Sequence, residues 1–295
     1  MNPVEAARTF RNLANRTFCI GVGAQKAGTS WLFNYLGCHP EIAMSPIKEL
    51  HYFDQIYRPD LCSTWRKEFD RQAAESISQL ASGETGSITN LQYLIDRVRM
   101  NVDPAAYLEY FDRLATHGRS VVGEITPSYS LLPEVGFSAL RNTILGAAAT
   151  PRIVFVMRDP VERFWSQCRF EAPGSFEQSA DKVYERALRD PQFLERTRYD
   201  VTIARLRAVF GAEELLLLFY EDLFDYATIE RLCRFLHVAY VKPDVAIRIH
   251  ASAAGALDQA RRLRAREIFA PVYAFIEKEF ADSVPTAWQH SRPGT

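Results

Sequence analysis

Residues 23–30 read Gly-Ala-Gln-Lys-Ala-Gly-Thr-Ser, a phosphate-loop frame in which the lysine is displaced. In nucleotide kinases and ATPases the loop is G-x-x-x-x-G-K-[ST], with the lysine directly after the second glycine. Here Thr29 occupies that position, and Lys26 lies inside the loop. The apolar run over residues 17–22 predicts a strand before the loop, and residues 31–36 predict a helix, with Gly37 as the left-handed C′ residue just past its end. A loop that opens a helix can bind an anion on its free backbone N–H groups.

The loop continues into the helix as Gln-Lys-Ala-Gly-Thr-Ser-Trp-Leu over residues 25–32. This segment resembles the 5′-phosphosulfate loop, K-x-G-T-[ST]-x-L, of sulfotransferases that use 3′-phosphoadenosine-5′-phosphosulfate (PAPS). The resemblance implies PAPS as the donor, bound by Gln25, Lys26, Ala27, Gly28, Thr29 and Ser30. It also implies that Trp31 stacks on the adenine, whereas the alternative is a tryptophan packed in the core. For the loop as a whole, the alternative is an ordinary turn between a strand and a helix.

A second motif follows the apolar run over residues 152–157, which predicts a buried parallel strand. Asp159 suits a helix N-cap, and the proline after it suits the first helical turn. Arg158 and Ser166, two turns apart, can then face one anion from two sides. The stretch resembles the family's R-D-P-x-x-R-x-x-S motif, which implies that these two residues hold the ribose 3′-phosphate. The alternative for Arg158 is a salt bridge with Asp159 or Glu162.

A third motif, Lys-Glu-Leu-His-Tyr-Phe-Asp, occupies residues 48–54. It resembles the K-E-x-H-[FY]-F-D segment of the glycan sulfotransferases. The resemblance implies that Glu49 is the base that deprotonates the acceptor, with His51 and Asp54 as supporting polar groups. His51 is the competing base, because another branch of the family uses a histidine. The alternatives without function are a hydrogen-bonded core histidine and a solvated glutamate.

The implied chemistry suits these residue types. Sulfuryl transfer from a phosphosulfate leaves a phosphate, so negative charge grows on the bridging oxygen while the acceptor attacks in line. Lys26 can neutralise that oxygen, and the backbone N–H groups of residues 28–30 can hold the 5′-phosphate. The transferred group carries a single negative charge, and the sequence contains no metal-ligand motif. We therefore expect the reaction to need no metal.

Further segments resemble the family with less detail. Residues 121–129 predict a strand that leads into a polar turn, but Ile125 stands where many glycan-type members have a lysine. Either another residue replaces that cation, or the acceptor is less anionic. Residues 198–210 predict a helix, followed by a buried strand with a Y-E-D-L ending. This block resembles the family, and the resemblance implies that Tyr199 binds the donor. Residues 250–255 lie where the family covers the adenosine, and their sequence suggests no role.

The composition of the 295-residue chain, 47% hydrophobic, predicts one large α/β core. We expect a P-loop-like sulfotransferase fold with a mainly parallel sheet: an extension over residues 1–16, then one domain over residues 17–295. Within that domain, residues 55–119 should form an acceptor-side insertion that sets specificity. The net charge of -1 gives no reason to propose nucleic acid or a membrane surface, and the arginines of residues 261–266 suit a solvated helix face.

Five cysteines without paired spacing argue against a disulfide framework, and the chain has neither a signal-like N-terminus nor an 18-residue apolar run. These features predict a soluble, cytoplasmic protein. Its expected activity is transfer of a sulfuryl group to a hydroxyl or amine of a small-molecule, lipid or sugar acceptor. A small-metabolite kinase is disfavoured by the missing lysine after Gly28, and an inactive nucleotide-binding protein by Glu49. The oligomeric state stays open.

Overall fold

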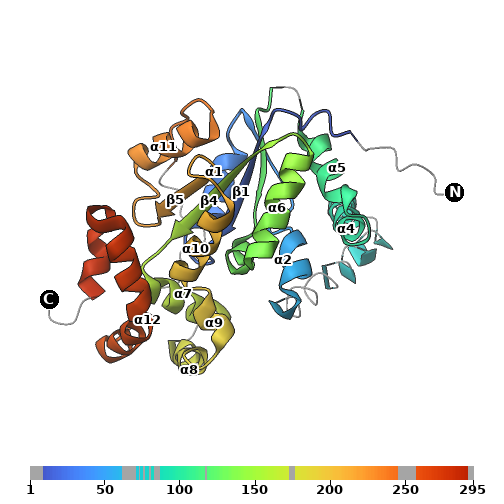
Figure 1. Cartoon of the computed structure of the whole chain (residues 1–295). Coiled ribbons are helices and arrows are strands. Elements are labelled where there is room, and N and C mark those ends of the chain that lie inside the picture. The colour runs from blue at the N-terminus through green and yellow to red at the C-terminus, as the bar shows by residue number, and fades with distance from the viewer. Residues whose placement is uncertain are drawn as a thin grey trace.

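Five parallel strands form a single sheet in the order β2-β3-β1-β4-β5 (Figure 1). This computed structural model describes residues 9–61, 71–72, 74–75, 77–79, 81–82, 87–116, 118–172, 177–244 and 257–291. The strands are β1 Thr17–Gly23, β2 Ile42–Met44, β3 Val121–Ile125, β4 Thr150–Met157 and β5 Leu215–Phe219. The central strand β1 pairs in parallel with both β3 and β4. The predicted fold class, a mainly parallel sheet flanked by helices, is confirmed.

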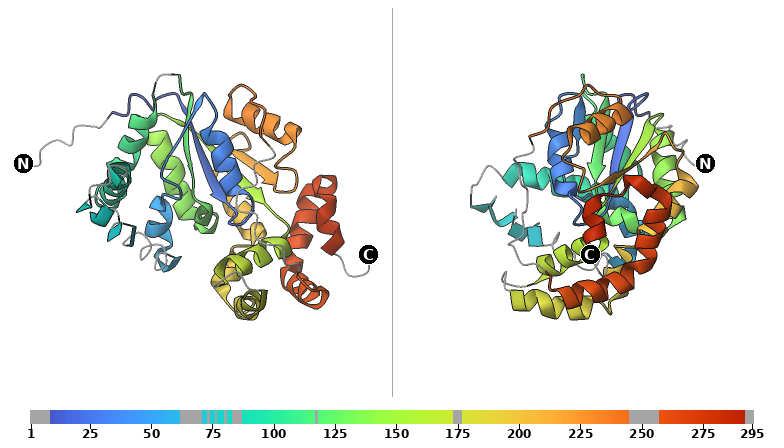
Figure 2. Two further views of the ribbon diagram at one scale, coloured as in Figure 1. Left: turned by 180° about the vertical axis from the view of Figure 1, so that it is seen from behind. Right: turned by 90° about the vertical axis from the view of Figure 1, so that its left-hand side faces the viewer.

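Helices cover both faces of the sheet, with α1 on one face and α6 and α10 on the other (Figures 1 and 2). The helices before β4 are α1 Thr29–Gly37, α2 Tyr52–Tyr57, η1 Pro59–Leu61, α4 Ser87–Val102, α5 Ala105–Leu114, η2 Pro127–Leu131 and α6 Glu134–Gly146. Those after β4 are α7 Pro160–Glu171, α8 Glu177–Ala187, α9 Pro191–Glu195, α10 Tyr199–Val209, α11 Tyr226–Leu236, α12 Gln259–Phe280, η4 Ala281–Ser283 and η5 Thr286–Ser291. Among the described helices, none has the length and apolarity to cross a membrane.

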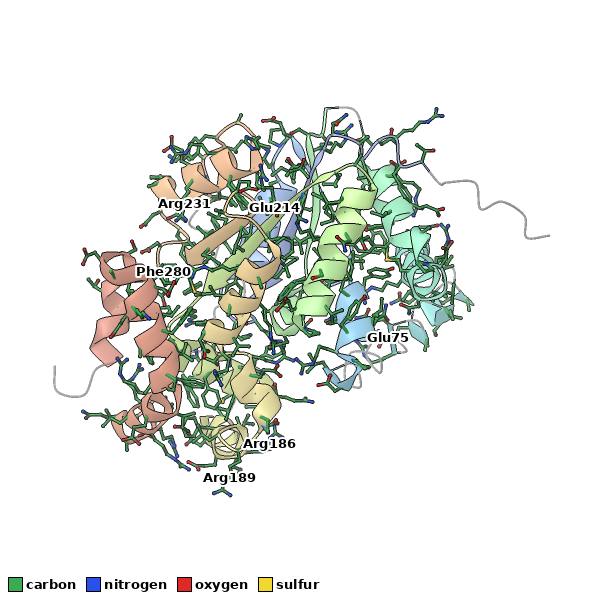
Figure 3. All side chains as sticks on the ribbon, in the orientation of Figure 1. Glu75, Arg186, Arg189, Glu214, Arg231 and Phe280 are labelled. Carbon is green, nitrogen blue, oxygen red and sulfur yellow. The ribbon has the colours of Figure 1, made fainter. Side chains whose placement is uncertain are left out.

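The strand sequences explain this layering. In both β1 and β4, every residue after the first is buried. A strand covered by helices on both faces must be apolar on both, which accounts for the continuous apolar runs. At the start of β5, Glu214 accepts hydrogen bonds from Arg141 of α6 at 3.0 and 3.1 Å; Figure 3 labels Glu214. This ion pair links α6 to the beginning of the edge strand β5.

Two sequence-based expectations need correction. β2, a three-residue strand paired with β3 at the edge of the sheet, was not predicted. Three residues are too short for an apolar period to be visible. Gly37 was expected to end the first helix in a left-handed conformation, but it is the last residue of α1, and Cys38 caps the helix with φ −85°. The prediction for Gly37 is therefore wrong.

The basic stretch of α12 pairs with acids of two neighbouring helices at the molecular surface. Arg261 pairs with Asp181 of α8 at 2.9 Å, and Arg262 pairs with Glu162 of α7 at 2.6 Å. Arg264 pairs with Glu185 of α8 at 2.9 Å. These ion pairs link α12 to the two helices that follow β4, and the arginines keep partial exposure to solvent, in agreement with a solvated helix face.

The strand order determines where a ligand can bind. The chain runs from β1 outward to the β2 edge, returns to β3, and then crosses β1 to reach β4 and β5. In open parallel sheets the crevice at such a change of direction, beyond the carboxyl ends of the strands, is the usual ligand site. The loop at residues 24–28 leaves the carboxyl end of β1 at this point.

We expect Gly28→Ala to destabilise the protein by roughly 1 to 3 kcal/mol. Gly28 has φ +81°, and an added Cβ would lie 2.8 Å from Tyr220 Cδ2 and 2.9 Å from Leu223 Cδ2. The matched control is Gly37→Ala, because nothing lies within 4 Å of a Cβ at that helical position. That control should match the wild type or gain about 0.5 to 1 kcal/mol. Urea unfolding followed by circular dichroism measures both, and equal stabilities would contradict the expectation.

Candidate functional site

The loop after β1 and the end of β4 meet at the carboxyl edge of the sheet. Gly28, at the N-cap of α1, has the left-handed conformation, and Lys26 has φ 69°. A non-glycine residue in that region is strained and needs support from its surroundings. The carbonyl of Lys26 accepts a hydrogen bond from Arg158 Nη1 at 3.1 Å. The structure thus brings the first two sequence motifs into direct contact.

Positive charge gathers around Lys26. Its Nζ lies 4.0 Å from the centre of the Phe170 ring. Burial, followed by repulsion from Arg158, Lys48 and two further arginines, lowers the pKa of Lys26 to about 8. Lys48 Nζ donates to Ser30 Oγ at 2.8 Å, so it also reaches the loop. In the part of the chain that the structure describes, no carboxylate forms an ion pair with these two lysines or with Arg158. Lys26 and Arg158 are partly buried, and cations in such places are costly without counterions, so this cluster favours an anionic ligand.

Arg163 is a further member of this cluster that sequence reasoning missed. It is fully buried, and burial lowers its pKa to about 10. Its partners are neutral: Nε donates to Thr197 Oγ1 at 2.8 Å, and Nη1 to Gln167 Oε1 at 2.7 Å and to the Gln25 carbonyl at 3.5 Å. Its Nη2 has no hydrogen-bond partner among the described residues. The available signal was the second arginine of the R-D-P-x-x-R motif.

The acids beside Arg158 are engaged elsewhere, which argues against the salt-bridge alternative. Asp159 Oδ1 accepts from the Glu162 backbone N–H at 3.0 Å and caps α7 as expected. Asp159 Oδ2 accepts from Tyr273 Oη of α12 at 2.8 Å. The Glu162 side chain pairs with Arg262 at 2.6 Å. Neither acid forms an ion pair with Arg158 in the described part of the chain.

Two tyrosines contact Arg158. Tyr199, fully buried, donates its hydroxyl to the Arg158 carbonyl at 2.9 Å. The Arg158 guanidinium carbon lies 4.7 Å from the centre of the Tyr220 ring. Ser166 is on α7 and is 6% exposed. Residues 250–255, to which the sequence assigned no role, lie outside the described residues.

Trp31 packs within the core. It is 5% exposed, with its ring centre 5.6 Å from that of Tyr35 and 5.1 Å from that of Phe224. This packing agrees with the core interpretation of the tryptophan, and its contact with an adenine stays a prediction.

The third motif forms a row of acid, imidazole and acid. His51 Nδ1 lies 2.7 Å from Asp54 Oδ2, and its Nε2 lies 3.7 Å from Glu49 Oε2. Ser128 Oγ donates to the same Asp54 oxygen at 2.5 Å. Glu49 and His51 both have left-handed backbones, with φ 55° and 56°. Arg97 of α4 supports this conformation by donating to the Lys48 and Glu49 carbonyls at 2.8 and 3.0 Å.

The charges of this row differ from those of isolated side chains. Burial lowers the pKa of His51, but the bonds to Asp54 and Glu49 outweigh burial and raise it to about 9. Burial raises the pKa of Glu49, but the nearby His51, Lys48 and Arg196 outweigh burial and lower it below its usual value. Near neutral pH, His51 is therefore an imidazolium that cannot accept a proton. Glu49 is a carboxylate that can.

Ile125, which stands where a lysine was expected, is buried against β1. It is 3% exposed, and a Cβ built on Gly21 would lie 2.7 Å from its Cγ1. Its neighbour Glu124 points to the other face of β3, where it accepts hydrogen bonds from Tyr107 and Thr126 at 2.7 Å each. Burial raises the pKa of Glu124, so this carboxyl group is held by hydroxyls in the core.

Comparison with known proteins agrees with the fold. The model of a sulfotransferase family matches residues 19–242. A sulfotransferase from Alicyclobacillus acidocaldarius shares the fold, with a TM-score of 0.59 and 24% identity over 94% of this chain and 98% of its own. A sulfotransferase domain of the Synechococcus PCC 7002 olefin synthase is less similar, with a TM-score of 0.48 and 16% identity over 87% of this chain and 95% of its own. Among curated protein sequences, none matches the chain significantly.

The row predicts a pH-dependent contribution to stability. Because folding raises the pKa of His51 from 6.5 to about 9, its contribution is complete below about pH 6.5 and is lost as the pH rises through about 9. The difference in unfolding free energy between wild type and His51→Asn should shrink across that window, by at most roughly 3 kcal/mol. Asparagine is chosen because it tolerates the left-handed backbone. Urea unfolding at several pH values measures the difference, and a constant difference would argue against a charged His51.

Proposed function

The chain belongs to the sulfotransferase family, and we propose that it transfers a sulfuryl group from PAPS to an acceptor hydroxyl or amine. The observation that carries the proposal is the cluster of Lys26, Lys48, Arg158 and Arg163 beside an ionised Glu49. The cluster has the charge to bind a donor with several phosphate oxygens. The glutamate has the charge to take a proton from the acceptor.

On the donor side, the backbone N–H groups at the start of α1 would hold the 5′-phosphate. Arg158, directly after β4, and Ser166, on the helix α7 that follows it, would hold the 3′-phosphate. Lys26 would neutralise the bridging oxygen as it becomes a phosphate oxygen. Arg163 does not need to touch the donor to matter, because its bond to the Gln25 carbonyl positions the loop.

On the acceptor side, Glu49 would remove the acceptor proton as the acceptor oxygen or nitrogen bonds to sulfur. The bond between sulfur and the bridging oxygen breaks in the same step, and 3′,5′-diphosphoadenosine leaves with that electron pair. His51 would orient the Glu49 carboxylate, and Asp54 would fix His51. Arg97, from within residues 55–119, already contacts this segment, which supports an acceptor-side role for that excursion. The acceptor would be a small molecule, a lipid or a sugar.

Two rival functions remain distinguishable. A kinase of a small metabolite needs a lysine where Thr29 stands. A nucleotide-binding protein without activity has no use for an ionised glutamate held by an imidazolium beside the anion site. The test of the proposed function is incubation with PAPS and a metabolite extract, with mass detection of products that gain one SO₃. Products with ATP and none with PAPS would favour the kinase, and binding without any product would favour the inactive protein.

We expect 3′,5′-diphosphoadenosine to raise the melting temperature, because it carries both phosphates of the donor. Arg158→Ala should weaken its binding by about 1.5 to 3 kcal/mol through loss of a charge-assisted hydrogen bond. The control is Arg207→Ala, which removes an exposed arginine that pairs with Glu279 of α12. Calorimetric titration measures the affinities. If ATP, which lacks the 3′-phosphate, stabilises the protein equally well, the assignment of this site is wrong.

We expect Glu49→Gln to bind 3′,5′-diphosphoadenosine normally but to lose turnover by about 10² to 10⁴, the usual effect of removing a positioned base. His51→Asn should lower turnover less, because His51 orients the base and does not accept the proton. Both variants are compared at saturating PAPS with an acceptor from the screen, and binding of the diphosphoadenosine controls for folding. Near-normal turnover in Glu49→Gln, with none in His51→Asn, would assign the base to His51.

A further inference from the structure

Phe170 is an exposed aromatic residue near the end of α7. It is 68% exposed, whereas Phe164, on another side of the same helix, is fully buried in the core. Single exposed apolar residues are common on protein surfaces and by themselves indicate nothing. Phe170 differs because the Lys26 ammonium lies over its ring, with Nζ 4.0 Å from the ring centre. The exposed ring is thus in contact with the cation proposed for the bridging oxygen of the donor.

The side of α7 that carries Phe170 is also the side that contacts the donor loop. Residues 163, 166 and 170 are three and four positions apart, so their side chains lie along one side of the helix. Arg163 Nη1 donates to the Gln25 carbonyl at 3.5 Å, and both Arg163 and Ser166 are buried. Phe170 lies one turn beyond Ser166, where this side of the helix reaches solvent. It therefore lies at the open end of the donor site.

The contact with Lys26 indicates which part of a ligand would meet the ring. Under the proposed function, Lys26 holds the bridging oxygen, which is the end of the nucleotide that faces the acceptor. The acceptor approaches the sulfur in line, and reacting atoms come within about 3 to 3.5 Å of each other. The group that carries the attacking atom is then within reach of a ring that contacts Lys26. A phenyl ring has no hydrogen-bonding group, so it favours an apolar partner.

We propose that Phe170 binds the apolar body of the acceptor, and so selects acceptors whose hydroxyl or amine is carried by an aromatic ring or an alkyl chain. The proposal rests on the sulfotransferase function proposed above. An acceptor that covers the ring removes from water the apolar surface that the protein leaves exposed. The proposal also agrees with Ile125, because an apolar acceptor needs no cation in place of the lysine expected there.

The test compares probe acceptors with different bodies: 2-naphthol and 1-octanol, which are apolar, and methyl glucoside, which is polar. Sulfation from PAPS is followed by mass, and kcat and KM are determined for each probe. Each probe is also titrated calorimetrically into protein saturated with 3′,5′-diphosphoadenosine, which measures binding without turnover. In the wild type, at least one apolar probe should bind and should have a kcat/KM about 10-fold or more above that of the glucoside.

Phe170→Ala should raise KM and the dissociation constant of the apolar probes by about 10- to 100-fold, and leave those of methyl glucoside unchanged. Phe170→Tyr, which keeps a ring, should retain most of the affinity of the wild type. Binding of 3′,5′-diphosphoadenosine should be the same in all variants. The matched control is Tyr226→Ala on α11, because Tyr226 is 51% exposed and has Lys242 Nζ 5.7 Å from its ring centre.

Four results would overturn the proposal, and the first is a wild type that prefers methyl glucoside. An unchanged KM in Phe170→Ala would mean that the ring does not contact the acceptor. An equal fall in kcat for every probe would mean that Phe170 only positions Lys26, and weaker binding of 3′,5′-diphosphoadenosine would mean that it packs on the nucleotide.

Binding of the nucleotide separates the levels of failure. A protein that binds 3′,5′-diphosphoadenosine but neither binds nor sulfates an apolar probe refutes only the role of Phe170. A protein that neither binds this nucleotide nor sulfates any probe refutes the proposed function as well.

Discussion

Repulsion among enclosed cations is the constraint around which the carboxyl edge of this sheet is built. Lys26, Arg158 and Arg163 converge without a carboxylate among their described ion pairs. The fold holds them with neutral groups: backbone carbonyls of the loop, the Thr197 hydroxyl and the Gln167 amide. Neutral acceptors orient a guanidinium while leaving its charge intact, whereas a carboxylate would have cancelled it. The same bonds therefore fix the loop to α7 and to the segment before α10, and preserve the field that an anion would meet.

The parts of the fold that could be predicted have local signals. β1, β4 and β5 are continuous apolar runs because helices cover both faces, and the displaced lysine of the loop is visible without any structure. β2 escaped prediction because its three residues are strand only through their pairing with β3. The strand order itself depends on contacts between distant segments, which residue periodicity cannot encode. A local rule also misled at Gly37, since a glycine near a helix end need not be the residue that turns left-handed.

In the candidate site, too, some residues could be predicted from the sequence and others could not. Motifs placed Lys26, Glu49 and Arg158, and the structure brings all three motifs to one edge of the sheet. Their supports could not be predicted, because they arrive from elsewhere in the chain: Arg97 from α4 and Tyr273 from α12. No sequence spacing links these residues to the motifs they serve. Even within a motif, packing decides the outcome, as the buried ring of Trp31 illustrates.

Under the proposed function, donor binding would precede proton removal from the acceptor, because the charges of the donor site also act on the base. Burial and then repulsion lower the pKa of Lys26, whereas burial raises the pKa of Glu49 but is outweighed by attraction to His51 and Lys48, which lowers it. A phosphate-bearing donor would neutralise part of the field of Lys26 and Lys48, and so raise both pKa values. Lys26 would then be fully charged when the bridging oxygen needs it, and Glu49 would become a stronger base only once the donor is in place. The imidazolium of His51, held by the buried Asp54, keeps Glu49 ionised through this change. The lysines beside the loop thus couple donor binding to the basicity of a carboxylate on a different segment.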